Sequence, residues 1–434
     1  MNKKQYKIFL SYVIPSVFAF ALSGIYTIID GFFVGNSVGD IGLSTINIAY
    51  PVVSLLQALG TGIGMGGAVM YTLNQSSGKN DVAKKYLRCT TTMLFVASII
   101  LTIALFFTMK PVLGLLGATG KIADLGIAYL QYIIIGAVFQ IFATGVVPII
   151  RNNNGVNFAM GIMIAGFVCN IALDYLFVWI FEWSVAGAAL ATIIGQALTA
   201  IGGFIYLAYH KIPVWGIKIR GVGKEVKDIL KIGIAPFGIT LTPLISHLFM
   251  NRFSVQYGGE IAVASYACIG YVFAIVCLLV QGVGDGSQPL ISHYYGDKNY
   301  TATFQIRKLA YDTAIILSII CIVGLYAARG KIGILFGASN ATTNNVATSL
   351  PIFLCGYIFL AFSRVTTAAF YATEKVGYSY TLVYIEPVLQ VILLLFLPHF
   401  CGQTGVWWCM PLAQILTAVI AAILKSLDNQ GKVT

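Results

Sequence analysis

The residues with most potential for chemistry are the few ionisable side chains that fall inside long apolar segments. These are Asp30, Asp174, Asp285, Glu386 and Arg364. A charged side chain is costly inside a membrane, so it is usually kept there for a function. Asn170 precedes Asp174 by four residues, and on a helix this spacing places both side chains on one face, one turn apart.

Asp30 and Asp174 suggest a site for a cation or a proton. Two carboxylates, an amide oxygen and a hydroxyl in a cavity of low dielectric constant suit sodium, and crowded, desolvated carboxylates also take up a proton near neutral pH. The alternative for each buried Asp is a hydrogen-bond acceptor for helix ends or for Ser and Thr. Asp285 lies in a glycine-rich stretch, where it would equally cap or kink a helix. Glu386 would either select cationic substrates or pair with Arg364.

The elements that position these residues are predicted to be membrane-spanning helices. Hydrophobic residues make up 58% of the 434 residues and charged residues 9%, against roughly 25% charged in a typical soluble domain. Such a chain cannot cover itself with polar groups, which excludes a soluble enzyme. Apolar runs long enough to cross a bilayer lie at residues 8–34, 43–73, 86–109, 125–150, 157–181, 185–209, 229–256, 260–293, 307–328, 345–373, 377–400 and 405–424. We therefore predict an all-α integral membrane protein with twelve transmembrane helices.

The 26 basic residues predict how these helices are oriented. Nineteen of the 26 fall at the termini and at one set of helix ends, whereas only Lys110, Lys121, Arg329 and Lys331 fall at the other set. Because cytoplasmic loops carry the excess of Lys and Arg, both termini are predicted to be cytoplasmic. The net charge of +11 is then a topology signal with attraction to anionic lipid, and no nucleic-acid partner is expected.

The sequence repeats with a period near 220 residues. Gly62-Ile-Gly-Met-Gly66 recurs as Gly282-Val-Gly-Asp-Gly286, and Pro15 recurs as Pro236. A polar segment lies at the midpoint, so we predict two six-helix lobes at 1–209 and 229–424, a cytoplasmic loop at 210–228 and a cytoplasmic tail at 425–434. Parallel repeats of six spans, related by a pseudo-two-fold axis with the substrate path between them, are typical of alternating-access transporters.

The repeat also ranks the candidate acids. Asp30 aligns with Asn251, and Asp174 aligns with Leu394. Neither carboxylate is therefore required by the shared scaffold, which indicates a function that belongs to the amino-terminal lobe.

Five motifs spread along the chain form a pattern that resembles a known family. They are Pro15 with Tyr26-Thr-Ile-Ile-Asp30-Gly, Asn170-Ile-Ala-Leu-Asp174, Val185-Ala-Gly-Ala-Ala-Leu-Ala-Thr192, Ile234-Ala-Pro-Phe237 and Gly282-Val-Gly-Asp-Gly-Ser-Gln-Pro289. Together they resemble the multidrug and toxic compound extrusion (MATE) family, in its bacterial multidrug branch. The resemblance implies an antiporter in the plasma membrane of a prokaryote, and not an enzyme. It implies export of organic cations or drugs in exchange for H+ or Na+, by a monomer with no cofactor beyond that coupling ion.

The resemblance also assigns roles to residues. It implies a cation or proton site formed by Asp30, Asn170, Asp174, Thr192 and Tyr26, and a bend of the first helix at Pro15. One departure concerns span 7, which carries His247 and Asn251 where other members carry a functional acid. Candidate substrate-cavity residues are then His247, Asn251, Asp285, Arg364 and Glu386.

Two other functions are compatible with a polytopic chain. A flippase for a lipid-linked saccharide or a peptidoglycan precursor would need a basic cavity for pyrophosphate, and Arg364 is the main deep base. An integral-membrane transferase would need a metal-binding acidic motif or a group of catalytic histidines, and the four histidines are scattered along the chain. Both functions are therefore ranked below the antiporter.

Overall fold

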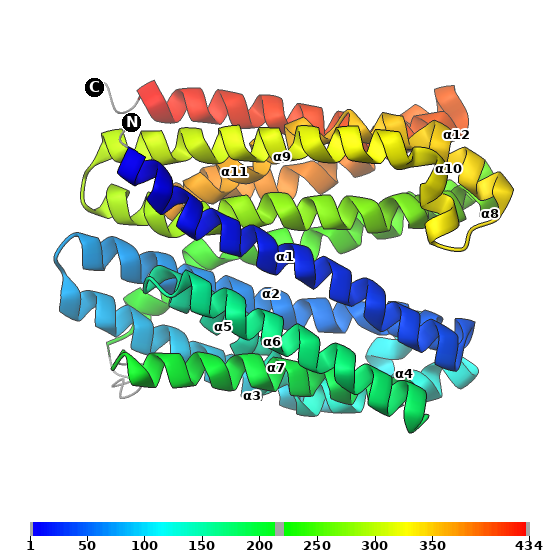
Figure 1. The fold of residues 1–434 in the computed structure, drawn as a ribbon, viewed down its shortest axis with the longest axis horizontal. Coiled ribbons are helices and arrows are strands. Elements are labelled where there is room, and N and C mark those ends of the chain that lie inside the picture. Colours follow the sequence, from blue (N-terminus) through cyan, green and yellow to red (C-terminus); the bar gives the residue numbers. More distant parts are fainter. Residues whose placement is uncertain (1–2, 213–220, 431–434) are drawn as a thin grey trace. The chain divides into compact units, whose positions relative to one another are not determined.

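The computed structural model describes residues 3–212 and 221–430, and within these ranges every regular element is a helix (Figure 1). Part of the predicted loop at 210–228 and the end of the predicted tail at 425–434 lie outside the described residues. The elements are α1 (Lys3–Val38), α2 (Asp40–Ser76), α3 (Asn80–Leu115), α4 (Gly120–Ile135), α5 (Ala137–Asn152), α6 (Val156–Asp174), the π-helix η1 (Tyr175–Ile180), α7 (Ser184–Tyr209), α8 (Gly223–Gly296), α9 (Tyr300–Leu335), α10 (Asn340–Leu354), α11 (Tyr357–Ala372) and α12 (Val376–Gln430).

These elements correspond to twelve membrane spans within the described ranges. The 74 residues of α8 would extend about 110 Å as one straight helix, far more than the roughly 30 Å hydrocarbon core of a bilayer. Gly259 in α8 and Gly402 in α12 have positive φ, which breaks each element into two spans. Conversely, α4 and α5 meet at 55° and α10 and α11 at 47°, and each bent pair forms one span. The predicted fold class is confirmed.

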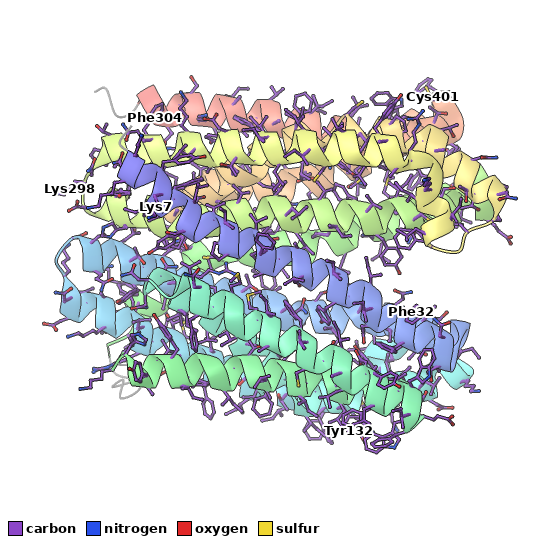
Figure 2. The ribbon with its side chains drawn as sticks, in the orientation of Figure 1. Lys7, Phe32, Tyr132, Lys298, Phe304 and Cys401 are labelled. Atoms are coloured by element: carbon purple, nitrogen blue, oxygen red, sulfur yellow. The ribbon has the colours of Figure 1, made fainter. Side chains whose placement is uncertain are left out.

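Large apolar side chains cover much of the outer surface of these helices. Phe32 on α1 and Phe304 on α9 are each more than half exposed, and Figure 2 shows such side chains around the ribbon. Exposed apolar surface on this scale is unfavourable in water, but it is suited to lipid acyl chains. The exposed residues therefore support the assignment of these helices to a membrane.

The helices form two compact units. The amino-terminal unit comprises residues 21–240 and 292–299, and the carboxyl-terminal unit comprises residues 1–20, 241–291 and 300–434. The first residues of α1 thus pack within the carboxyl-terminal unit, and the first residues of α8 pack within the amino-terminal unit. The lobe boundaries drawn from the sequence stay a prediction.

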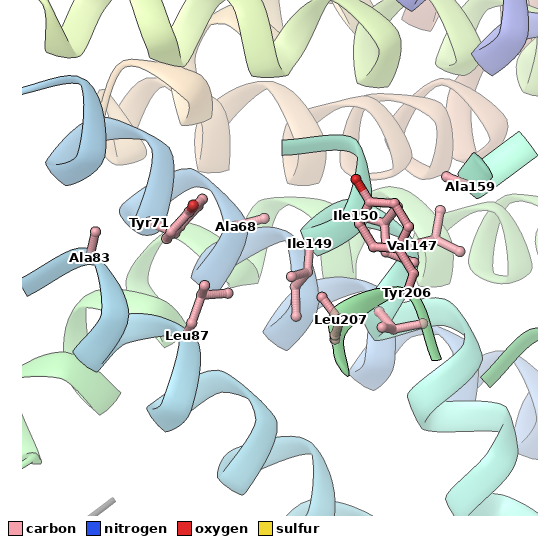
Figure 3. Packing of buried hydrophobic residues seen from close by; sticks show 11 residues of the cluster. Ala68, Tyr71, Ala83, Leu87, Val147, Ile149, Ile150, Ala159, Tyr206 and Leu207 are labelled. Carbon is pink, nitrogen blue, oxygen red and sulfur yellow. The ribbon is translucent and has the colours of Figure 1, made fainter. Parts of the chain in front are cut away.

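The core of the amino-terminal unit lies where α2, α3, α5, α6 and α7 meet. Its buried side chains include Ala68, Leu87, Ile149, Ala159 and Leu207, which pack together (Figure 3). Two tyrosines of this core form hydrogen bonds with Asn153. The Tyr71 hydroxyl donates to the Asn153 side chain at 2.7 Å. The Tyr206 hydroxyl donates to the Asn153 carbonyl at 3.0 Å. These bonds satisfy the polar ends of large buried rings.

Glycines spaced along α2 allow three other helices to approach it closely. A Cβ atom at Gly64 would collide with the backbone of Gly145 on α5. A Cβ atom at Gly62 would lie 2.9 Å from the carbonyl oxygen of Gly233, at the start of α8, and Gly67 faces Thr90 on α3. Small residues at such crossings are a common means of packing membrane helices.

The glycine motif that recurs 220 residues later packs in the same way. A Cβ atom at Gly282 would lie 2.7 Å from Cα of Val17 on α1, and one at Gly286 would lie 2.9 Å from Cα of Val13. Gly284 faces Ala368 on α11, with 3.2 Å to its Cβ atom. In both copies of the motif, one side of the glycine helix packs against the first turns of another helix, α8 or α1. Another side packs against the second helix of a bent pair, α5 or α11.

Replacing Gly64 by Ala is predicted to destabilise the protein. The added methyl group forces α2 and α5 apart, and such overpacking costs about 1–3 kcal/mol. Thermal unfolding of the purified protein in detergent measures the effect as a lower Tm. The matched control is Gly161→Ala on α6, where no atom lies within 4 Å of the new methyl group. An equal Tm for the two variants would contradict this packing.

Candidate functional site

Asp30 and Asp174 approach each other inside the amino-terminal unit. Asp174 is fully buried at the end of α6, where the chain continues as the π-helix η1. Wider turns of this kind are frequent at functional sites. Asp30 is half-buried on α1, and its carboxyl group is close enough to that of Asp174 for the two to interact directly.

Each of the two carboxyl groups keeps one oxygen without a partner. Oδ1 of Asp30 and Oδ1 of Asp174 are buried and receive no hydrogen bond from any residue that the structure describes. Buried polar atoms are almost always paired in folded proteins, and two adjacent carboxylates repel each other in a medium of low dielectric constant. The pair is therefore suited to hold a proton or a small cation between its oxygens.

Asn170 links the carboxyl pair to α7. When its amide group is oriented to match its neighbours, the nitrogen donates to Oδ2 of Asp174 at 3.3 Å. Its oxygen then accepts from the backbone N–H of Thr192 at 3.2 Å. Gly166 on α6 and Gly195 on α7 make this reach possible, since a Cβ atom on either would lie within 3 Å of the other's carbonyl oxygen.

A small pocket lies beside this network. It encloses about 200 Å³, including the space at its mouth, and it is lined by Tyr26, Gly166, Phe167, Asn170, Thr192, Gly195, Gln196 and Thr199. The Tyr26 ring stacks on Phe167 with centroids 4.8 Å apart. The structure thus brings Tyr26, Asp30, Asn170, Asp174 and Thr192 into one neighbourhood, and ion binding by them stays a prediction.

Five residues that line the pocket were not predicted from the sequence, namely Gly166, Phe167, Gly195, Gln196 and Thr199. Gln196 follows Thr192 by four residues, so helical spacing alone would have placed it on the same face of α7. Phe167 precedes Asn170 by three residues, so helical spacing also places these two side chains on the same face of α6. Neither residue was singled out, because the apolar helices contain many other aromatic and polar residues at similar spacing.

Pro15 lies within a helix that continues past it. It is buried, and α1 extends without a break from Lys3 to Val38. A proline removes one backbone hydrogen bond and weakens the helix at that turn. The bend implied at Pro15 stays a prediction.

The candidate substrate residues lie in the carboxyl-terminal unit and differ in their surroundings. Asp285 is buried and accepts a hydrogen bond from the Tyr371 hydroxyl at 2.9 Å, which favours a packing role. His247 packs against the Tyr266 ring, with centroids 5.5 Å apart, and Asn251 is exposed. Arg364 and Glu386 form an ion pair at 3.7 Å, and a role of Glu386 in selecting cationic substrates stays a prediction.

Known proteins share this architecture and much of this sequence pattern. The MatE family profile matches residues 15–176 and 238–396. Multidrug export protein MepA of Staphylococcus saprophyticus subsp. saprophyticus is 24% identical over 427 residues, which are 97% of this chain and 94% of that protein.

Two solved structures have a very similar fold. One is a MATE structure in complex with MaL6, with a TM-score of 0.93 and 21% identity, covering 99% of this chain and 98% of that chain. Another is a MOP superfamily transporter from Pyrococcus furiosus, whose binding pocket is described as having reversed polarity. Its TM-score is 0.91 at 20% identity, with 98% of this chain and 96% of that chain covered.

The family profile covers most of the chain and includes the carboxyl pair. Pro15, Tyr26, Asp30, Asn170 and Asp174 all fall inside its first matched segment, whereas Thr192 falls between the two segments. The chain therefore belongs to the MatE family.

Proposed function

We propose that the protein is a secondary active exporter that expels organic cations in exchange for Na+ or H+. The observation that carries this proposal is the pair of carboxyl groups of Asp30 and Asp174, each with one buried oxygen that has no partner among the described residues. A proton or a cation from outside would complete the pair. Its relatives are transport proteins and not enzymes, and several carry the name multidrug export protein.

Coupling requires only that ion and substrate favour different conformations of the protein. An ion at Asp30 and Asp174 removes the repulsion between the two carboxylates and draws α1 towards α6. Pro15 gives α1 a weak turn at which it can respond. The conformation stabilised by the ion would then release the substrate, and loss of the ion would restore substrate affinity.

A flippase for a pyrophosphate-linked lipid is less compatible with the charges of the described residues. Such a substrate needs a basic cavity, but Arg364, the deepest base in the sequence, is neutralised by Glu386. The acidic character of the amino-terminal site also disfavours an anionic substrate. Cationic compounds are therefore the better supported cargo.

Reconstituted protein should expel a cationic dye when a Na+ or H+ gradient is imposed across proteoliposomes. Asp30→Asn and Asp174→Asn should each reduce gradient-driven efflux at least about tenfold, because the amide can neither release a proton nor balance a cation. Dye fluorescence under each gradient, imposed separately, measures the effect.

The matched control is Asp312→Asn on the exposed surface of α9, which should leave efflux unchanged. Comparable insertion of all variants is checked by the yield of folded protein. Full efflux by both carboxyl variants, or a wild type that responds to neither gradient, would overturn the proposed coupling.

The proposed orientation places both termini in the cytoplasm, and Cys401 tests it directly. This exposed cysteine lies beside Gly402, at the junction of the two spans of α12, and Figure 2 labels it. It should react with a membrane-impermeant maleimide added to intact cells, and Cys401→Ser should abolish that labelling. In the Cys401→Ser background, Lys79→Cys, between α2 and α3, should stay unlabelled until the cells are opened. The reverse pattern would contradict the orientation.

A further inference from the structure

A second charged site lies deep in the carboxyl-terminal unit. Nη2 of Arg364 on α11 lies 3.7 Å from Oε2 of Glu386 on α12. Arg364 precedes the end of α11 by eight residues and Glu386 follows the start of α12 by ten, which places them about 12 Å and 15 Å along their helices. Both charges therefore lie more than two helical turns from these helix ends, within predicted membrane spans.

This ion pair is loose and open. Its single contact is longer than a hydrogen bond, and the two side chains are 14% and 17% exposed. A charged pair that faced acyl chains would be strongly unfavourable, so this exposure indicates a polar space. By contrast, Asp428 near the end of α12 is fully buried between Lys375 at 2.9 Å and Arg307 at 3.4 Å. That second arrangement holds helix ends together, whereas the long contact between Arg364 and Glu386 leaves the carboxylate able to accept a second cation.

The repeat relates this site to the pocket of the amino-terminal unit. With the offset of 220 residues, Glu386 corresponds to Gly166 and Gln390 corresponds to Asn170. Gly166 and Asn170 both line the pocket beside Asp174. The carboxyl-terminal unit thus carries an acid and an amide at positions whose equivalents line a pocket.

Cys277 on α8 lies near this ion pair. Its thiol is close enough to Arg364 and Glu386 to interact electrostatically with both. Its residue surface is partly accessible. It therefore offers a native position at which occupancy of the site can be followed chemically.

We propose that Glu386 is the carboxylate that binds the cationic group of the transported compound, and that Arg364 occupies this carboxylate when no compound is bound. An unpaired carboxylate is highly unfavourable at this depth. The guanidinium of Arg364 stabilises the carboxylate of Glu386. It also lowers the affinity for the compound, since an incoming cation has to displace Arg364. A neutral compound gains nothing from Glu386. The proposal rests on the proposed function and adds the residues that select for positive charge.

Two substitutions at this pair should act in opposite directions on the binding of tetraphenylphosphonium to the purified full-length protein. Glu386→Gln removes the acceptor and leaves Arg364 to repel the ligand, so the Kd should rise about tenfold. Arg364→Gln removes the competitor, so the Kd should fall several-fold at pH 8. Neither change should alter the Kd of neutral triphenylphosphine oxide. The double variant lacks both charges, so its Kd should lie below that of Glu386→Gln and above that of Arg364→Gln.

Controls separate this site from a merely structural ion pair. Glu260→Gln, an exposed acid of the same unit, should leave both Kd values unchanged. In a variant that keeps only Cys277, tetraphenylphosphonium should slow modification of the thiol by a methanethiosulfonate, and Glu386→Gln should remove this protection. A Kd that rises in both single variants, or that stays the same in both, would overturn the proposal. Either result leaves gradient-driven efflux by the wild type intact, so it is distinguishable from failure of the proposed function.

Discussion

An ionised carboxylate inside a membrane requires a partner, and the functional organisation of this protein follows from that requirement. The two units meet it differently. In the amino-terminal unit, Asp30 and Asp174 lie next to each other, and one oxygen of each has no partner among the described residues. In the carboxyl-terminal unit, Glu386 already has a partner in Arg364. In the proposed mechanism the first pair would bind the coupling ion, and the second would bind the cationic cargo.

Close packing of glycines is what makes such sites possible among apolar helices. Gly166 and Gly195 bring α6 and α7 together so that Asn170 reaches both Asp174 and Thr192. The glycines of α2 and of the second half of α8 likewise allow the surrounding helices to pack closely against them. Because helix association in lipid has little hydrophobic driving force, these backbone approaches and the polar contacts they allow stabilise the fold.

The sequence was sufficient for much of this account, because lipid imposes strict rules on a chain. Twelve apolar runs predicted twelve spans, including those hidden inside α8 and α12, since Gly259 and Gly402 fall between separate runs. The scarcity of acids identified Asp30 and Asp174. Side-chain pairing could not be predicted in the same way. Whether Glu386 met Arg364, or Asp285 met Tyr371, depends on helix rotation and on contacts between distant segments.

The central claim is that ion and substrate are linked through Asp30 and Asp174, and it is tested most directly at equilibrium. The Kd of tetraphenylphosphonium for the purified protein should be measured over a range of Na+ concentrations and of pH, without any gradient. Linkage is reciprocal, so the Kd should increase with Na+ or with proton concentration. Asp30→Asn should make it independent of both. A wild-type Kd that responds to neither ion would contradict the account.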